Sequence, residues 1–165
     1  MKKSLLIIIS FGFALNSIGQ QASSDEGFTN KAEAKNQLVN GVKDGKWVEY
    51  DTCYGNNPNN DTIGEICGYK LTVYRDDKPV GVIREYSIDG KIKSEIPMKS
   101  GKENGTENRY YDSGKLHLET PYVNDKRNGT VKEYYENGKL KTETIYTNNK
   151  AGETKNYDEN GNEIK

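Results

Sequence analysis

Hydrophobic and polar residues alternate over short runs in the second half of the chain, and glycine-containing turns separate these runs. The clearest case spans residues 129–146, where a run ending at Tyr134 and a second run beginning at Leu140 flank Asn137-Gly138. Such alternation indicates strands, and Asn-Gly between two strand-like runs is typical of a β-hairpin. The sequence therefore predicts a hairpin over residues 129–146.

The same pattern recurs at a fixed period. Its leading glycines are 24, 24 and 23 residues apart, and each is followed by a tyrosine after five residues and a turn glycine after nine. The recurring positions are Gly81, Gly105, Gly129 and Gly152; Tyr86, Tyr110, Tyr134 and Tyr157; and Gly90, Gly114, Gly138 and Gly161. A period of this kind indicates stacked supersecondary units. We expect an all-β protein with a single elongated antiparallel sheet, built as a meander of hairpin repeats of about 24 residues.

The periodicity also divides the chain. Gly45 opens a divergent first copy, in which a turn-rich insertion around 54–62 separates the two expected strands. Residues 21–36 are polar and aperiodic, and we expect a flexible leader there. The predicted organisation is listed by residue number: 1–20 signal peptide, 21–36 leader, 37–165 repeat array, with a divergent first repeat 45–80, repeats 81–104, 105–128 and 129–151, and a C-terminal cap 152–165.

The register of each hairpin depends on its turn. A two-residue turn at Asn137-Gly138 places Tyr134 opposite Lys141, whereas a three-residue turn with a bulge places it opposite Leu140. The bulged register separates apolar from charged residues better, and we prefer it. It predicts one face with Tyr134, Leu140, Thr142, Thr144 and Tyr146, and an opposite face with Glu133, Lys139, Lys141 and Glu143.

The composition favours a thin sheet over a thick core. Hydrophobic residues make up 32% of the 165 residues, and the aromatic residues are 12 Tyr, 3 Phe and 1 Trp. Tyrosine can be half buried while its hydroxyl stays in water. The net charge is −1 and lysines alternate with glutamates, so we do not expect nucleic acid as a partner.

The N-terminus has the pattern of a secretory signal peptide. Lys2 and Lys3 precede an apolar run over 5–15, and a small polar exit follows it. The run is shorter than the ~20 residues that a membrane span requires. We expect cleavage near residues 18–21, no integral membrane span after cleavage, and an exported protein that is periplasmic or secreted.

Cys53 and Cys67, the two cysteines of the chain, flank the insertion. In an oxidising compartment such a pair favours a disulfide across the loop. A metal pair is the alternative, but no neighbouring Cys or His supplies further ligands. We expect the disulfide.

Candidate catalytic residues are few. His117 takes the position that Lys93 and Lys141 hold in the neighbouring repeats, which favours a surface substitution. Glu95, Glu119 and Glu143 recur at the repeat period beside lysine or histidine, as a charge ladder does, and not as the acid pair of a glycosidase. We expect no enzymatic activity, no catalytic residue, no cofactor and no metal site.

Aromatic residues form the most distinctive set. They predict either a thin half-core or a binding strip, since Tyr and Trp dominate interaction hot spots. The members of this aromatic stripe are Trp47, Tyr50, Tyr86, Tyr110, Tyr134 and Tyr157.

The unit Gly-x3-Glu-Tyr-Tyr-x-Asn-Gly-Lys-Leu-Lys-x-Glu-x2-Tyr, followed by Asn148-Asn-Lys-Ala-Gly152, resembles the MORN-repeat variant. That variant occurs in bacterial proteins often labelled YwqK-like antitoxins of toxin–antitoxin systems. The resemblance covers about 40–165 and is strongest over 81–161. It implies a hairpin meander in which each repeat adds two strands to one sheet, and it carries no catalytic residues.

Two functions follow as hypotheses. The first is a non-enzymatic exported repeat scaffold that binds a partner protein or envelope component through a sheet face or edge. The second is an antitoxin or immunity-like protein that neutralises a toxin partner inside the cell. Open sheet edges also predict self-association or strand addition.

Overall fold

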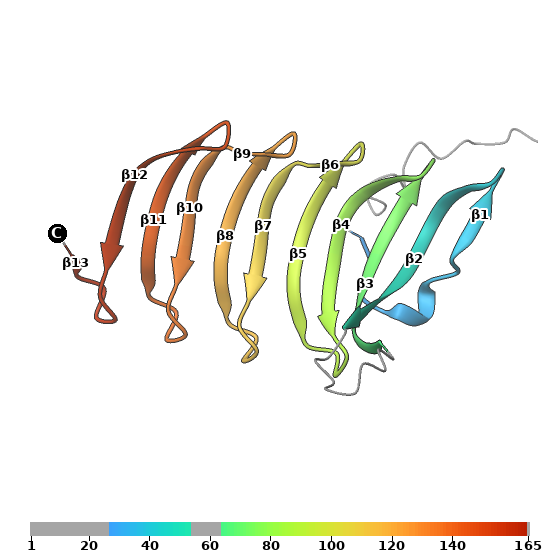
Figure 1. The fold of residues 1–165 in the computed structure, drawn as a ribbon, viewed down its shortest axis with the longest axis horizontal. Helices are drawn as coiled ribbons and strands as arrows, with labels where there is room; N and C mark the ends of the chain where they lie inside the picture. Colours follow the sequence, from blue (N-terminus) through green and yellow to red (C-terminus); the bar gives the residue numbers. More distant parts are fainter. Residues whose placement is uncertain (1–26, 54–63, 165) are drawn as a thin grey trace, which may run out of the picture.

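The computed structural model describes residues 27–53 and 64–164 and shows one open sheet of 13 antiparallel strands. The strands lie side by side almost in chain order, with β1 at one end and β13 at the other (Figure 1). The bounds are η1 Lys31–Glu33 (a single 3-10 turn), β1 Gln37–Val39, β2 Val42–Cys53, β3 Glu65–Arg75, β4 Lys78–Ser87, β5 Ile92–Lys99, β6 Lys102–Glu103, β7 Gly105–Tyr110, β8 Leu116–Val123, β9 Lys126–Arg127, β10 Gly129–Tyr134, β11 Leu140–Thr147, β12 Lys150–Tyr157 and β13 Glu163–Ile164. The predicted single elongated antiparallel sheet is confirmed.

Three-residue loops close the hairpins β4–β5, β7–β8, β10–β11 and β12–β13, and these loops lie along the lower edge in Figure 1. In one of them, the Tyr135 N–H donates to the Lys139 carbonyl and the Gly138 N–H donates to the Tyr135 carbonyl, both at 2.8 Å. Gly138 has a φ of 86°, a left-handed conformation that glycine adopts without a Cβ penalty. Tyr134 pairs with Leu140, so the predicted bulged register is confirmed.

A second irregularity overturns the predicted composition of the two faces. Glu133 pairs with Thr142, and Lys141 is left over as an extra residue between the two pairs. Because one extra residue moves all following side chains to the other face, Glu143 lies on the face of Tyr134. Thr142 and Thr144 lie on the opposite face, with Glu133. The same shift occurs next to Tyr86 and Tyr110. Each face is therefore mixed, and neither is purely charged.

Two-residue turns along the other edge tie each hairpin to the one before it. Asn124 and Asp125 have φ values of 49° and 66°, as a type I′ turn requires. The Asp125 N–H donates to the Glu103 carbonyl at 3.0 Å, and the Asp125 Oδ1 accepts the Glu103 N–H at 2.8 Å. Asn149 forms the same pair of bonds with Arg127, and Asp77 forms it with Lys43. These reciprocal bonds fix the stacking of neighbouring units.

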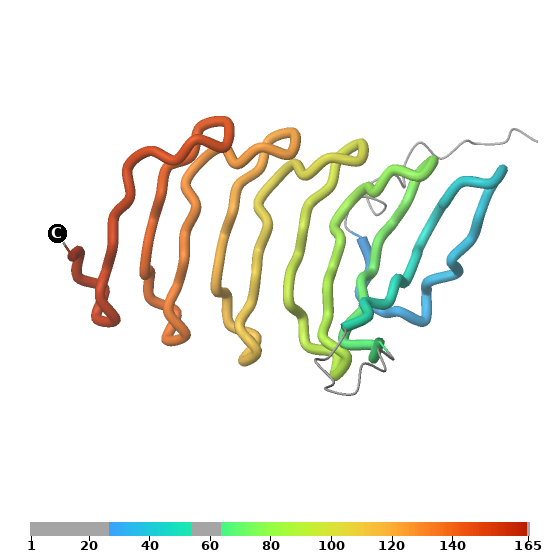
Figure 2. The backbone as a smooth tube through the Cα atoms, in the orientation of Figure 1, coloured from blue at the N-terminus to red at the C-terminus, as the bar shows by residue number. Residues whose placement is uncertain are grey.

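Residues 27–36, which we call the strap, pack against the sheet at its N-terminal end. The Phe28 side chain is 5% exposed and lies against Tyr69 and Leu71, the other buried hydrophobic residues of the described chain. In Figure 2 the blue strap runs from beside β4 towards the outer side of β2. This part of the expected flexible leader is thus ordered on the sheet, because the Phe28 ring replaces water over an apolar part of the surface.

The strap also covers the outer edge of β2. The Lys35 N–H donates to the Lys46 carbonyl, and the Asn36 side chain exchanges two hydrogen bonds with the backbone of Val48, at 3.0 and 2.9 Å. The Asn36 amide here takes the place of a neighbouring strand. An edge covered in this way is closed to strand addition.

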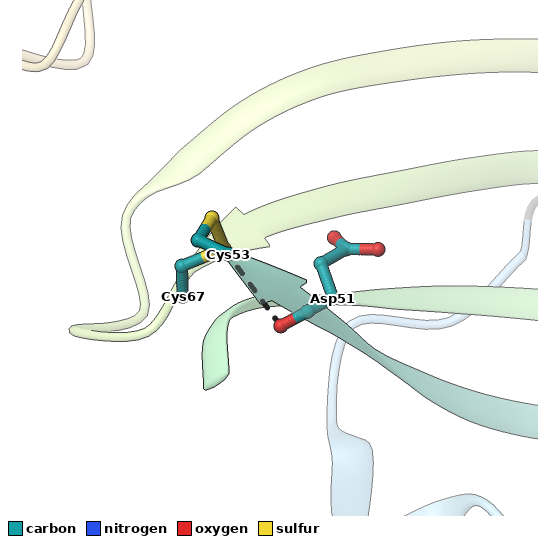
Figure 3. The surroundings of a disulfide bond; sticks show 3 residues. All are labelled: Asp51, Cys53 and Cys67. Carbon is teal, nitrogen blue, oxygen red and sulfur yellow. Dashed lines mark hydrogen bonds between the residues drawn. A yellow bond between two sulfur atoms is a disulfide. The ribbon is translucent and has the colours of Figure 1, made fainter. Parts of the chain in front are cut away.

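The disulfide joins Cys53 in β2 to Cys67 in β3 (Figure 3). Their Cα atoms are 5.7 Å apart, and the Cys67 Sγ lies 3.7 Å from the Asp51 carbonyl oxygen. The bond bridges two paired strands at the end where the insertion leaves the sheet. The predicted pairing is confirmed; the insertion at 54–63 and the predicted signal peptide lie outside the described residues.

Candidate functional site

The recurring tyrosines and glutamates form a ladder of hydrogen bonds across one face, which we call the Tyr–Glu face. The Tyr134 hydroxyl donates to the Glu119 Oε2 at 2.6 Å, from β10 to β8. Equivalent bonds join Tyr110 to Glu95 at 2.8 Å and Tyr157 to Glu143 at 2.7 Å. Each repeat thus binds the preceding one through a side-chain pair at the same position.

The ladder changes the acidity of its tyrosines. Burial, followed by the hydrogen bond to a glutamate, raises the pKa of Tyr110 and of Tyr134 to about 12. For Tyr157 the hydrogen bond to Glu143 is the main cause of a pKa raised to about 12. A phenol that donates to a carboxylate resists ionisation, because a phenolate would repel that carboxylate. These tyrosines are therefore neutral hydrogen-bond donors at neutral pH, poorly suited to act as bases.

A second set of tyrosines, which the sequence reasoning did not single out, donates hydrogen bonds to the following repeat. The Tyr111 hydroxyl donates to the Tyr134 carbonyl at 2.6 Å, and the Tyr135 hydroxyl donates to the Tyr157 carbonyl at 2.8 Å. Both lie on the face opposite the Tyr–Glu face, since they are one residue beyond Tyr110 and Tyr134. The doubled Tyr-Tyr in two repeats was the available sequence signal. A repeat can therefore bond to the preceding repeat on the Tyr–Glu face and to the following repeat on the opposite face.

The aromatic stripe is divided between the two faces. Tyr50 and Tyr86 lie on the Tyr–Glu face with the ladder tyrosines, and Tyr86 stacks on Tyr69 with ring centroids 5.0 Å apart. Trp47 lies on the opposite face, where its ring meets Tyr74 edge-on at 6.1 Å. The reason is that Trp47 is three residues before Tyr50, and an odd separation in a strand changes the face.

His117 lies on the surface opposite the Tyr–Glu face. Its ring is 4.2 Å from the ring of Tyr111, and its Nε2 is 3.6 Å from the Glu133 Oε1. Lys141 approaches that same carboxylate oxygen at 2.7 Å, and its hydrogen bond is the main cause that lowers the pKa of Glu133. Glu119, the carboxylate two residues along the strand from His117, instead binds Tyr134. The hydroxyl of Tyr111, whose ring packs on His117, donates to the Tyr134 carbonyl.

Within residues 27–53 and 64–164, the face opposite the Tyr–Glu face contains one buried carboxylate. Glu107 is 4% exposed and pairs with the Arg109 Nε at 2.7 Å. Nearby, burial and the charge of Glu107 raise the pKa of Glu103. Over residues 27–53 and 64–164, no group of three or more His, Cys, Asp or Glu side chains is arranged to hold a metal ion. The same ranges contain no helix with the length and hydropathy to cross a membrane.

The fold and its side-chain ladders define a protein built from stacked β-hairpin repeats in a single open sheet. Two consecutive units, residues 103–124 and 127–148, match the MORN repeat variant. Each unit begins in the short strand after one two-residue turn, β6 or β9, and ends at the first residue of the next turn; the two units include Tyr110 and Tyr134 of the ladder. No curated protein and no solved structure matches the chain.

Proposed function

We propose that this protein is an exported, non-enzymatic repeat scaffold that binds a partner polypeptide or envelope component through a face of its sheet. The observation that carries the proposal is the use of the recurring polar residues. Glu95, Glu119 and Glu143 each accept a tyrosine hydroxyl from the next repeat, so the residues that recur most regularly hold the sheet together. We therefore assign the binding function to the extended surface of the sheet that these residues support.

That surface suits binding. In β5, β8 and β10 the residues of the sheet are mostly half-buried, although no second layer of secondary structure covers the described strands. Interlocking bonds on both faces and along both edges keep the backbone rigid, which lowers the entropy cost of association. The MORN repeat units over residues 103–124 and 127–148 are consistent with a scaffold role.

Export distinguishes this proposal from the antitoxin hypothesis. The Cys53–Cys67 disulfide is the structural feature that favours an oxidising compartment over the cytosol. The corresponding test is fractionation with N-terminal sequencing. We expect the mature chain outside the cytoplasm with its first residue near 18–21; recovery of the intact chain from the cytosol would favour the antitoxin.

The binding role is tested with a mature, disulfide-bonded bait cross-linked in an envelope extract. Two exposed threonines provide matched variants: Thr106→Arg on the Tyr–Glu face and Thr154→Arg on the other. Ile88→Ser, at a hairpin loop and 57% exposed, is the control away from both faces. We expect a specific partner that one threonine variant loses and the other two baits retain. Enrichment of the same proteins by all three variants and wild type would contradict the proposal.

A further inference from the structure

The strap shows how a polypeptide segment sits on this sheet. Gly27 lies against the Val82 carbonyl, since a Cβ added to it would clash with that oxygen. The Phe28 carbonyl accepts a hydrogen bond from the Arg84 Nη1 at 3.4 Å, and the Lys46 Nζ lies 5.4 Å from the centre of the Phe28 ring. Leu71 and Val73 form the apolar floor. We call these five sheet residues, on β2, β3 and β4, the strap seat.

The repeat places a counterpart of each seat residue at the other end of the array. Along β3 and β11 the step is three periods of 24, so Leu71 and Val73 correspond to Glu143 and Ile145. The other three seat residues are counted from the leading glycines. Lys46 and Val82 come one residue after a leading glycine, and Arg84 comes three residues after one. Lys46 corresponds to Thr130, Val82 to Glu153 and Arg84 to Lys155.

These five counterparts line a hollow of about 130 Å³ on the Tyr–Glu face, between β10, β11 and β12. The hollow is thus a repeat copy of the strap seat, on which no described segment lies. Ile145, in the position of Val73, is 51% exposed. The Glu153 carboxylate has no ion-pair partner among the described residues, whereas the Lys155 Nζ is 3.9 Å from the Glu143 Oε1.

In the two hairpins between the strap seat and the hollow, a proline occupies the floor position and packs against the next repeat. Pro97 and Pro121 hold the position of Val73 and Ile145, and they lie over the leading glycines of the next repeat. A Cβ on Gly105 would be 2.9 Å from the Pro97 Cβ, and one on Gly129 would be 2.8 Å from the Pro121 Cγ. At the last repeat, the closest atom to such a Cβ on Gly152 is the Ile145 backbone oxygen at 3.3 Å, and the Ile145 side chain is left open. Val73 and Ile145, at the two ends of the described array, are the members of this set that are not proline.

The charges of the two places differ in sign. The strap seat has two cations. Lys46 pairs with Glu33 of the strap itself, and Arg84 pairs with Glu95 of β5 at 2.9 Å. The hollow has two carboxylates, Glu143 and Glu153, and one cation, Lys155. The counterpart of Lys46 is the uncharged Thr130, so Glu33 would lose its partner there, and the hollow gains two carboxylates. A segment that complements the hollow therefore carries a positive charge in place of Glu33.

We propose that the β10–β12 hollow binds an extended segment of a partner protein that presents an aromatic side chain to Ile145 and a basic side chain to Glu153. This inference rests on the proposed partner-binding function and specifies its site. The partner's backbone carbonyl accepts from the Lys155 ammonium, as the Phe28 carbonyl accepts from Arg84. The aromatic ring covers the exposed Ile145 and provides most of the affinity, as buried aromatic anchors do.

The test uses a synthetic, fluorescently labelled probe with the strap sequence 27–35 and Lys in place of Glu33. It is titrated against the full mature chain by fluorescence anisotropy. We expect saturable binding that weakens about tenfold or more when the probe carries Phe28→Ala or the protein carries Ile145→Ser. Ile164→Ser, in β13 and 53% exposed, is the matched control and should bind as wild type does. Glu153→Lys should weaken the basic probe and favour the probe that retains Glu33.

Equal affinity of the Ile145→Ser and Ile164→Ser proteins would overturn the proposed site. Dimerisation that buries the hollow would also overturn it. In that case sedimentation would show a dimer at high protein concentration, and probe binding would be lost at the same concentration. If the probe fails while Thr106→Arg still loses its partner in the envelope cross-linking experiment, the site is wrong and the binding function stands. If both experiments fail, the function fails too.

Discussion

The Tyr134 hydroxyl and the Glu119 carboxylate, 15 positions apart in the chain and 2.6 Å apart in space, join two repeats across the Tyr–Glu face. Each of these side chains belongs to a set that recurs at the repeat period. Because single hairpins are only marginally stable in water, such bonds between units contribute to the stability of the whole array. They also explain why the most regular residues are structural.

Removing one rung should destabilise the array measurably. For Tyr134→Phe we expect a loss of about 1–2 kcal/mol in the free energy of unfolding, because Glu119 loses a charge-assisted hydrogen bond while the ring remains. Urea unfolding followed by circular dichroism measures this loss. Tyr50→Phe is the control, since Tyr50 is 51% exposed and lies outside the ladder. Equal midpoints for the two variants would contradict a stabilising ladder.

The ladder also predicts an alkaline transition. The pKa values of Tyr110 and Tyr134 are raised from 10 to about 12 in the folded protein, so folding favours the neutral phenol. Their contribution to stability is fully present below pH 10 and is lost as the pH rises through about 12. Tyrosinate absorbance should show a group of tyrosines that ionises late. Tyr134→Phe should remove one member of that late group, and an unchanged titration curve would be evidence against it.

The ion pair of Glu133 with Lys141 predicts how the stability of the protein changes at acid pH. The Lys141 hydrogen bond lowers the pKa of this carboxyl below its ordinary value of 4.5. Its contribution is therefore present above pH 4.5 and disappears as the pH falls through the folded-state pKa. We expect Lys141→Met to reduce the loss of thermal stability between pH 5 and 3, in a comparison with wild type at both pH values. An identical pH dependence of the two proteins would argue against the pair.

The two-residue turns allow a test of the reciprocal hydrogen bonds between neighbouring hairpins. Asp125→Gly keeps the left-handed turn, and position 101 of the preceding turn is itself a glycine, but the variant loses the bond from the Glu103 N–H. We expect a cost of about 1 kcal/mol. Asp125→Ala should cost a further ~1 kcal/mol, because its Cβ disfavours a φ of 66° without a compensating side-chain bond. Chemical denaturation of the three proteins would give this order; a more stable alanine variant would contradict it.

Two glycines with positive φ should respond differently to alanine. At Gly138 an added Cβ meets no atom within 4 Å, so the cost is that of the backbone conformation alone, about 1 kcal/mol. At Gly129 the Cβ would also lie 2.8 Å from the Pro121 Cγ, and overpacking adds about 1–3 kcal/mol. Melting temperatures should therefore fall much further for Gly129→Ala. Similar values for both variants would mean that Pro121 yields easily.

The hairpin unit, its period and its turns were predictable from the sequence, because Asn-Gly, the leading glycines and the alternation are local properties of the chain. The pairing of Tyr134 with Leu140 and the disulfide between Cys53 and Cys67 also followed from local spacing. The assignment of side chains to faces did not follow. An extra residue at Lys141, visible only in the pairing of the two strands, moved Glu143 beside the tyrosines and separated Thr142 from them. Likewise, only the tertiary structure placed Phe28 on Leu71, since a lone aromatic residue in a polar leader gives no local sign of the surface it covers. That contact also shows which positions of the repeat receive a chain, and Ile145 is one of them.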